Sequence, residues 1–253
     1  ISACLVGSEM CIRDRIWRNH IAFVEDRLWH REGGADDVWI ARIAQGAFVG
    51  GAWSERATVP GARSSTRFDA STRPPTVSGT KYYSTGSLYA DWITVTAKTD
   101  DGADVLVVVD ASEAGVVRHD DWGGIGQRLT ASGTTELRDV PVAGDAVFPD
   151  GGRSPHQETI YQLVLVAAVA GVAVGARDDG AAAVRARVRN YPQGLAALPR
   201  EDAIVQETIG GVAAAAAAAR AVVVHAAREL DAGLEALLSL IHISEPTRQA
   251  EIS

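Results

Sequence analysis

The sequence predicts an α+β protein in which helical segments precede and follow a central run of strands. Three observations support this order. Apolar residues recur at helical spacing from Ile16 to Leu28. Between Phe48 and Val142 the pattern changes to short strand-like segments separated by turn signals. From Leu163 onward, apolar and alanine-rich stretches return to a helical pattern.

The N-terminal helical region is expected to contain two helices. The first is Ile16 to Leu28, in which Trp17, Ile21 and Val24 share one face. A Gly33-Gly34 break separates it from a shorter helix at Val38 to Ile43.

The central region is expected to contain five strands joined by turns. The segment Thr99-Asp100-Asp101-Gly102 is typical of a hairpin turn between two of them. The expected strands are Phe48 to Trp53, Thr76 to Tyr83, Trp92 to Ala97, Val105 to Val109 and Glu136 to Val142.

The C-terminal region is expected to form helices that pack in a bundle. Leu163 to Ala176 is an uninterrupted apolar run of 14 residues. Because a membrane span needs about 20 residues, we interpret the run as a helix buried in a bundle and expect no membrane contact. The next helix is expected to begin near Pro199, to include seven alanines at Ala213 to Ala219, and to continue to about Leu238. An alanine surface allows close approach of another helix or subunit.

Composition favours a globular protein with a small-molecule partner. The 253 residues are 47% hydrophobic and 22% charged, which disfavours a disordered chain. The formal net charge of -8 and the scattered arginines argue against a nucleic-acid surface.

The two ends differ in amino-acid composition from the rest of the chain. Cys4, Met10 and Cys11 are the only residues of their types. LVGSEMCIRDR and SLIHISEPTRQAEIS resemble peptides translated from sequencing-adapter DNA. We therefore expect adapter-like segments at 1–15 and 239–253 that pack poorly. Between them we expect the end of a helical domain at 16–47, a β domain at 48–150 and a partial helical bundle at 151–238. Without cysteine in that part and without a signal peptide, we expect a cytoplasmic protein with no disulfides.

The stretch from Gly79 to Val95, GTKYYSTGSLYADWITV, combines a small polar cluster with a strand. The hydroxyl groups of Ser84, Thr85 and Ser87 and the amide of Gly86 can hydrogen-bond a polar ring edge. A polar hairpin turn explains the same residues, because Gly and Ser are common in turns. The residues alone leave both interpretations open.

Other chemical signals are weak. No nucleophile elbow, zinc-binding histidine pair or phosphate-binding loop occurs, so we expect no metal site. Gly123 to Gly126 lacks the helix and acidic residue of a dinucleotide-binding turn. His20 lies beside an apolar helix position and can face a cleft or the core. Arg185, Arg187 and Arg189 are expected to alternate on a helix, where they bind a phosphate or face solvent.

Three segments in order resemble the acyl-CoA dehydrogenase superfamily, and more closely its flavin-dependent monooxygenase branch. They are GGAWSE (Gly50 to Glu55), GTKYYSTGSLYADWITV (Gly79 to Val95) and DDWGGIGQRLTASGTTELRDVPV (Asp120 to Val142). The resemblance implies a helical domain, a middle β domain and a C-terminal helical bundle, usually assembled as a tetramer. This chain would contain the end of the first, the whole second and part of the third.

The resemblance also implies site residues. Thr85, Ser84 and His20 would act at the flavin's reactive edge or the substrate side. Trp53, Ser54, Tyr83, Thr85 and Gly86 would contact the flavin ring, and Arg185 or Arg189 would hold the flavin phosphate across a subunit interface.

The segment Trp53-Ser54-Glu55-Arg56 replaces the T-E-P-x-x-G-S-D run of the dehydrogenases, which favours the monooxygenase branch. That branch implies a two-component enzyme: a separate reductase supplies reduced FMN, and oxygen is used to oxidise a small organosulfur or amine compound. An FAD-dependent acyl-CoA dehydrogenase and a non-catalytic scaffold are the alternatives.

Overall fold

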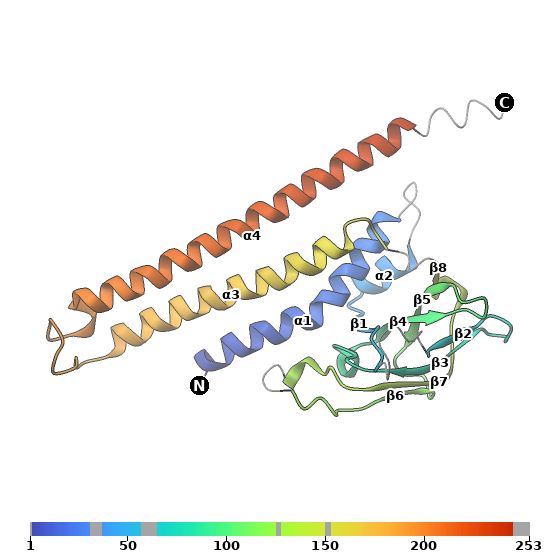
Figure 1. The fold of residues 1–253 in the computed structure, drawn as a ribbon, viewed down its shortest axis with the longest axis horizontal. Helices are drawn as coiled ribbons and strands as arrows, with labels where there is room; N and C mark the ends of the chain where they lie inside the picture. Colours follow the sequence, from blue (N-terminus) through green and yellow to red (C-terminus); the bar gives the residue numbers. More distant parts are fainter. Residues whose placement is uncertain (1, 31–36, 57–64, 125–127, 150–152, 245–253) are drawn as a thin grey trace. The chain divides into compact units, whose positions relative to one another are not determined.

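The computed structural model describes residues 2–30, 37–56, 65–124, 128–149 and 153–244 (Figure 1). The Gly33-Gly34 break and part of the Gly123 to Gly126 turn lie outside these ranges. The side chains of both predicted adapter-like segments also lie outside the description, so their packing stays a prediction. The chain divides into two compact units, Ser8–Leu165 and Ile1–Gly7 with Val166–Ser253.

The first unit is built on one mixed sheet of eight strands in the order β6-β7-β3-β2-β4-β5-β8, with β1 pairing β4. β1 and β2 are parallel to β4, and the other pairs are antiparallel. The strands are β1 (Val49–Ala52), β2 (Arg67–Asp69), β3 (Thr76–Lys81), β4 (Trp92–Lys98), β5 (Asp104–Asp110), β6 (Val116–Arg118), β7 (Thr135–Pro141) and β8 (Val147–Pro149).

The five predicted strands are confirmed as β1, β3, β4, β5 and β7. β2, β6 and β8 were not predicted, because three residues are too few to show an alternating pattern. The predicted turn joins β4 to β5, with the amide of Gly102 donating to the carbonyl of Thr99 at 2.9 Å. Gly102 has a φ of 85°, a left-handed conformation that glycine adopts without strain.

The core of this unit lies on β4 and β5. Ile93, Val95 and Val107 are fully buried, and Val95 lies opposite Val107 in the antiparallel pair. β-branched residues pack well on such a pleated surface. Burial does not alternate strictly along β4, because Thr94 is buried beside Ile93 and donates its hydroxyl proton to the carbonyl of Gly50 at 3.0 Å.

Two helices pack on the sheet within this unit. α1 (Ser2–Trp29) contains the predicted Ile16 to Leu28 helix, and α2 (Val38–Ala44) matches the second. Asp37 caps α2, since its carboxylate accepts from the Trp39 amide at 2.8 Å. The Trp39 indole N–H donates to the carbonyl of Asp145 at 2.8 Å, which joins α2 to the loop before β8. Short 3-10 helices occur at Ser87–Tyr89, Arg128–Thr130 and Gly144–Ala146.

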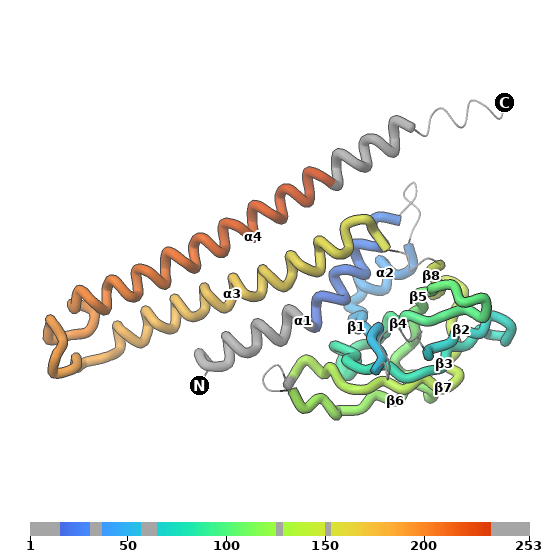
Figure 2. Tube along the Cα trace, viewed as in Figure 1, coloured from blue at the N-terminus to red at the C-terminus, as the bar shows by residue number. Residues whose placement is uncertain are grey.

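The second unit is a helical hairpin. α3 (Gln157–Ala186) begins in the first unit and continues into the second, where α4 (Ala203–Ser244) runs back beside it (Figure 2). A 3-10 turn at Pro199–Glu201 precedes α4, which begins at Ala203, a few residues after the start predicted near Pro199. A side chain at Gly180 would lie 3.3 Å from Ile209, so the missing Cβ permits the close approach of the two helices.

Two predictions about these helices are wrong. α3 has 30 residues and contains the 14-residue apolar run, with charged residues after it. The run was expected to be buried in a bundle, but α3 is largely exposed in this chain, since only 22% of its most apolar window is buried, against 6% for that of α4. By length and composition both helices could cross a membrane, although core helices of soluble proteins pass the same test. Finally, α3 ends at Ala186, so Arg187 and Arg189 lie beyond it and do not alternate on a helix.

Candidate functional site

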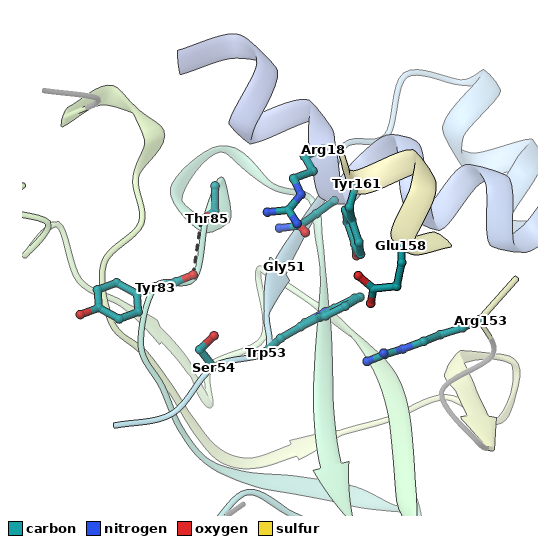
Figure 3. A pocket seen from close by; sticks show the side chains of 10 residues that line it. Arg18, Gly51, Trp53, Ser54, Tyr83, Thr85, Arg153, Glu158 and Tyr161 are labelled. Atoms are coloured by element: carbon teal, nitrogen blue, oxygen red, sulfur yellow. Dashed lines mark hydrogen bonds between the residues drawn. The ribbon is translucent and has the colours of Figure 1, made fainter. Parts of the chain in front are cut away.

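A cavity of about 370 Å³ opens in the first unit where β1 and β3 end (Figure 3). One side is formed by residues at or just after strand ends, and the other by side chains from α1, the start of α3 and the segment before α3. The lining residues are Arg18, Asn19, Gly51, Trp53, Ser54, Tyr83, Thr85, Arg153, Glu158 and Tyr161.

The strand side unites two of the three segments that carry the resemblance. The chain leaves β1 through Trp53-Ser54 and leaves β3 through Tyr83-Ser84-Thr85. The amide of Tyr82 donates to the carbonyl of Ser54 at 2.9 Å, and the amide of Gly51 donates to the carbonyl of Thr85 at 3.2 Å. These backbone contacts hold Trp53, Ser54, Tyr83 and Thr85 around one cavity, although about 30 residues separate the two segments along the chain.

Thr85 presents a hydroxyl group that its neighbours orient. Its Oγ1 lies 3.0 Å from Oγ of Ser132, which in turn lies 2.8 Å from Oγ1 of Thr130. Ser132 and Thr130 are buried and belong to the third resembling segment. These hydrogen-bonded hydroxyl groups connect the third resembling segment to the cavity, although Ser132 and Thr130 do not line it.

Gly86 and Tyr83 adopt left-handed backbone conformations beside Thr85. Gly86 has a φ of 77°, and its amide donates to the carbonyl of Thr130 at 2.9 Å. Tyr83 has a φ of 66°, which is uncommon for an aromatic residue and is typical of functional sites. Its ring points away from Trp53 (Figure 3) and packs edge to face with Trp122 at 5.8 Å.

Trp122 belongs to the segment Asp120-Asp121-Trp122. The carboxylate of Asp121 stabilises this segment. Asp121 accepts hydrogen bonds from the hydroxyl of Thr134 at 2.6 Å and from its amide at 2.7 Å. These bonds lower the pKa of Asp121. A side chain at Gly133 would lie 2.2 Å from the carbonyl oxygen of His119, so only glycine fits there. Asp121 therefore acts as a turn-stabilising group, and no cluster of three metal-ligating side chains is present among the described residues.

Trp53 forms the base of the cavity and is held at both ends. Its indole N–H donates to Oγ1 of Thr94 at 3.0 Å, and its ring packs edge to face with Tyr161 at 5.7 Å. Its carbonyl accepts from the hydroxyl of Thr96 at 3.0 Å and from Nζ of Lys81 at 3.3 Å.

Lys81 supports this base from beneath through a buried ion pair. Its side chain is fully buried, and Nζ lies 2.7 Å from Oε1 of Glu55. Burial lowers the pKa of Lys81, and the hydrogen bond and charge of Glu55 oppose that shift. Glu55 also accepts from the hydroxyl groups of Ser65 and Thr66 at 2.9 and 2.7 Å. The ion pair between Lys81 and Glu55 was not predicted. The available signal was that Lys81 ends β3 and that Glu55 follows shortly after β1.

The helix side of the cavity is charged. Arg18 comes from α1, Glu158 and Tyr161 from the first turns of α3, and Arg153 from the preceding segment (Figure 3). Tyr161 is buried, and this burial, reinforced by the negative charge of Asp26, raises the pKa of its hydroxyl. Sequence reasoning missed all four residues together with Asn19. The available signals were the position of Arg18 and Asn19 beside His20 and the three-residue spacing of Glu158 and Tyr161.

Two predicted catalytic residues lie outside the lining. His20 is buried, and its Nδ1 accepts a hydrogen bond from the amide of Val49 at 3.1 Å. Its ring stacks on Phe48, with 5.2 Å between ring centroids, and burial lowers its pKa. Ser84 is fully buried, and its hydroxyl oxygen has no hydrogen-bond partner among the described residues. Both residues lie next to lining residues in the chain, namely Asn19, Tyr83 and Thr85.

The predicted phosphate-binding arginines do not line the cavity. Arg185 and Arg189 belong to the second unit and are exposed. Arg185 lies in the last turn of α3, whereas Arg189 follows the end of that helix.

The lining fits a planar heteroaromatic ring. Thr85 and Ser54 offer hydroxyl groups, and Trp53 offers an aromatic surface. Gly51 lets the Asn19 side chain lie close against β1, because a Cβ at Gly51 would collide with Nδ2 of Asn19.

Solved structures define the class of this fold. The chain is similar to methanesulfinate monooxygenase MsuC from Pseudomonas fluorescens, with a TM-score of 0.72 and 21% identity over 90% of this chain and 62% of that one. It is also similar to FMN-bound TdsC from Paenibacillus sp. A11-2, with a TM-score of 0.67 and 23% identity over 85% of this chain and 59% of that one. The chain therefore shares the fold of these two proteins, which are acyl-CoA dehydrogenase-fold monooxygenases.

Curated relatives point to a more particular likeness. The chain is 30% identical over 135 residues to the dibenzothiophene monooxygenase of Rhodococcus erythropolis, which covers 47% of this chain and 32% of that protein. It is 31% identical over 133 residues to the dibenzothiophene monooxygenase of Mycolicibacterium goodii, and this match covers 46% of this chain and 32% of that protein. The chain thus spans about a third of the length of these relatives. No protein-family model matches it. The resemblance to the flavin-dependent monooxygenase branch is confirmed.

Proposed function

We propose that this chain is part of a two-component flavin-dependent monooxygenase. A separate reductase supplies reduced FMN, with FAD as the alternative flavin, and oxygen is used to oxygenate a small organosulfur or amine compound. When bound, the reduced flavin supplies the activation of oxygen. The residues of this chain bind and orient the two ligands and exclude water from them.

The observation that carries this proposal is the cavity itself. Two sequence segments that resemble the flavin-contacting segments of the family converge on one space of about 370 Å³, within the range of small-molecule sites. A non-catalytic scaffold has no need for such convergence. The structural similarity to FMN-bound TdsC, to XiaF in complex with FADH2 and to methanesulfinate monooxygenase supports the choice of cofactor and substrate class.

Each predicted site residue takes a role in this proposal. Thr85 donates a hydrogen bond to the reactive edge of the flavin, and Ser54 hydrogen-bonds the pyrimidine side. Trp53, Tyr83 and Gly86 shape the ring site. His20 and Ser84 act as positioning residues, because each is buried behind the lining. Arg185 or Arg189 binds the flavin phosphate from another subunit.

We also propose a cytoplasmic homo-tetramer. The exposed apolar faces of α3 and α4 would then be covered by other copies of the chain and not by lipid. Large exposed apolar surfaces in soluble proteins usually mark such interfaces. Cysteine and charge usage agree with a cytoplasmic protein that binds no nucleic acid.

The test is flavin binding followed by turnover. Titration of FMN into the purified chain should quench flavin fluorescence, and Ser54→Ala should weaken this binding. Ser112→Ala is the matched control, since Ser112 lies in a turn and does not line the cavity. With a flavin reductase, NADH, FMN and an organic sulfide, the product should be a sulfoxide detected by mass spectrometry. Anaerobic bleaching of the bound flavin by an acyl-CoA, with no sulfoxide formed, would support the dehydrogenase instead.

A further inference from the structure

Tyr161 is a buried residue of the cavity lining whose hydroxyl group has no partner in the protein. The residue is 5% exposed, and its phenol oxygen makes no hydrogen bond with any described residue. A buried hydroxyl group without a partner lowers stability, so native proteins contain few of them. Figure 3 shows the phenol extending from α3 toward Trp53, across the cavity from Thr85. The unpaired hydroxyl group therefore belongs to the side of the cavity opposite the proposed flavin edge.

A second donor without an acceptor lies against the same ring. Cζ of Arg18 is 4.4 Å from the centroid of the Tyr161 ring, so the guanidinium group lies over the ring face. Nε of Arg18 is buried and has no hydrogen-bond partner in the part of the chain that the structure describes. Both residues line the cavity of about 370 Å³. Two neighbouring donors that lack acceptors indicate a place for an acceptor atom of a ligand.

Asp26 of α1 is the carboxylate whose charge acts on Tyr161, but its oxygens bind other groups. Oδ1 accepts from the amide of Ser154 at 2.7 Å, and Oδ2 accepts from the side-chain amide of Gln157. These bonds fix the start of α3, the helix that carries Tyr161. The Tyr161 ring also packs edge to face with Trp53 at 5.7 Å. The phenol is therefore held by its helix and its ring contacts, and its hydroxyl group is not needed for this.

The surroundings of Tyr161 keep its hydroxyl group protonated. Burial raises its pKa, and the negative charges of Asp26 and Glu158 add to this rise. The positive charges of Arg18 and Arg153 oppose the rise of the pKa without reversing it. A protonated phenol donates one hydrogen bond and does not require a charged acceptor.

We propose that Tyr161 is a specificity-determining residue that donates a hydrogen bond to an uncharged acceptor oxygen of the substrate, such as a carbonyl oxygen, with Nε of Arg18 as the neighbouring donor. This inference rests on the proposed function and specifies its substrate class: the molecule carries a carbonyl group in addition to the atom that is oxygenated. Because Arg18 covers the Tyr161 ring, we expect its flexible side chain to shift when the ligand binds. A substrate without the acceptor leaves both donors unpaired and binds less tightly.

Thiochroman-4-one and thiochroman test this proposal, because both are cyclic aryl sulfides of the same size and only the first has a carbonyl group. Each is titrated by calorimetry into the chain with oxidised FMN bound, so that no turnover occurs. We expect thiochroman-4-one to bind at least about tenfold more tightly, the value of one hydrogen bond to a donor that is otherwise unpaired.

Variants locate the effect. Tyr161→Phe removes only the hydroxyl group and should bring the affinity ratio of the two sulfides close to one. Arg18→Lys keeps the charge but lacks Nε, and should lower the ratio about threefold. The control is Tyr82→Phe, because Tyr82 also carries a stacked arginine, with Cζ of Arg56 4.5 Å from its ring, but does not line the cavity.

Urea denaturation without ligand separates recognition from a structural role. Tyr161→Phe should unfold at an equal or higher urea concentration than the unsubstituted chain, since it removes a buried group that has no partner. A structural hydroxyl group would shift the midpoint to lower urea.

Four results would overturn the inference. Equal binding of the two sulfides to the unsubstituted chain shows that no acceptor is recognised. An unchanged affinity ratio in Tyr161→Phe places recognition elsewhere. A lower urea midpoint in this variant with an unchanged ratio assigns the hydroxyl group to the fold, and weaker FMN binding with an unchanged ratio assigns it to the flavin. Failure of the chain to bind FMN counts instead against the proposed function, and the two sulfides titrated without flavin then still test Tyr161.

Discussion

The centre of the sheet and the helical hairpin are both strongly apolar, yet they differ in burial. On β4 and β5, Ile93, Val95 and Val107 are fully buried. On the hairpin, Val169 of α3 is 69% exposed and Val222 of α4 is 61% exposed. The sheet therefore finds its packing partners within this chain, whereas the hairpin leaves much of its apolar surface uncovered.

This difference shows what an apolar pattern predicts. It indicates which faces avoid water, but it does not say whether the covering surface belongs to the same chain. A polar group can likewise be buried where the fold supplies partners. Lys81 is as buried as the valines around it, because Glu55, Thr96 and the Trp53 carbonyl bind its ammonium group.

The largest effect is expected at Lys81. Lys81→Met keeps the stem but leaves the Glu55 carboxylate without its cation, which should reduce the free energy of unfolding by about 3 kcal/mol. Lys98→Met is the control, because the Asp104 side chain of the Lys98–Asp104 pair is 77% exposed and the pair should contribute less than about 1 kcal/mol. Urea denaturation followed by circular dichroism measures both. Equal losses in the two variants would mean that burial adds nothing to the Lys81 pair.

The hairpin gives the next largest effect. If its apolar faces are covered by other copies of the chain, Val169 is buried in the assembly. Val169→Lys would then place a charge in the interface and should weaken self-association by about 2 kcal/mol. Light scattering coupled to size exclusion measures the mass. Val188→Lys is the control, because Val188 is 85% exposed and lies beyond the end of α3. A monomeric unsubstituted chain would contradict the proposed assembly.

A smaller effect is expected where the sheet meets the cavity. Thr85→Val removes the hydroxyl proposed to hydrogen-bond the flavin edge, at a cost of about 1 kcal/mol. The ratio of hydrogen peroxide to oxygenated product should then rise several-fold in the reductase-coupled assay. Thr208→Val, on the exposed surface of α4, should leave the ratio unchanged. A ratio that stays constant in Thr85→Val would remove Thr85 from the reactive edge.

The smallest effect concerns the joint between α1 and β1. Burial lowers the pKa of His20 below its ordinary value of 6.5. At a pH between the pKa of the folded chain and that of the unfolded chain, the unfolded chain therefore binds more protons. Stability should therefore fall as pH drops below 6.5, and protonation of Nδ1 also breaks its bond from the Val49 amide. His20→Asn should flatten this dependence in urea titrations at pH 7.5 and 5.5. His30→Asn is the matched control, since His30 is exposed. The same slope in His20→Asn would exclude His20 as its source.

The sequence by itself determined the order of elements, the five long strands and the segments that line half of the cavity. Strand periodicity and the Thr99 to Gly102 turn depend on neighbouring residues, so they can be recognised without coordinates. The pairing of the Trp53-Ser54 and Tyr83-Thr85 segments was expected from the resemblance alone, since no local pattern specifies contacts between strand ends.

Only the tertiary structure decided the charged half of the cavity and the places of His20 and Ser84. Arg18 lies far along the chain from Arg153 and Tyr161, and their common place in the cavity lining depends on how α1 and α3 pack on the sheet. The orientation of the His20 ring likewise depends on its hydrogen bond from the amide of Val49 on β1. Long-range packing and backbone satisfaction are not properties of any one segment, and so no segment could show them.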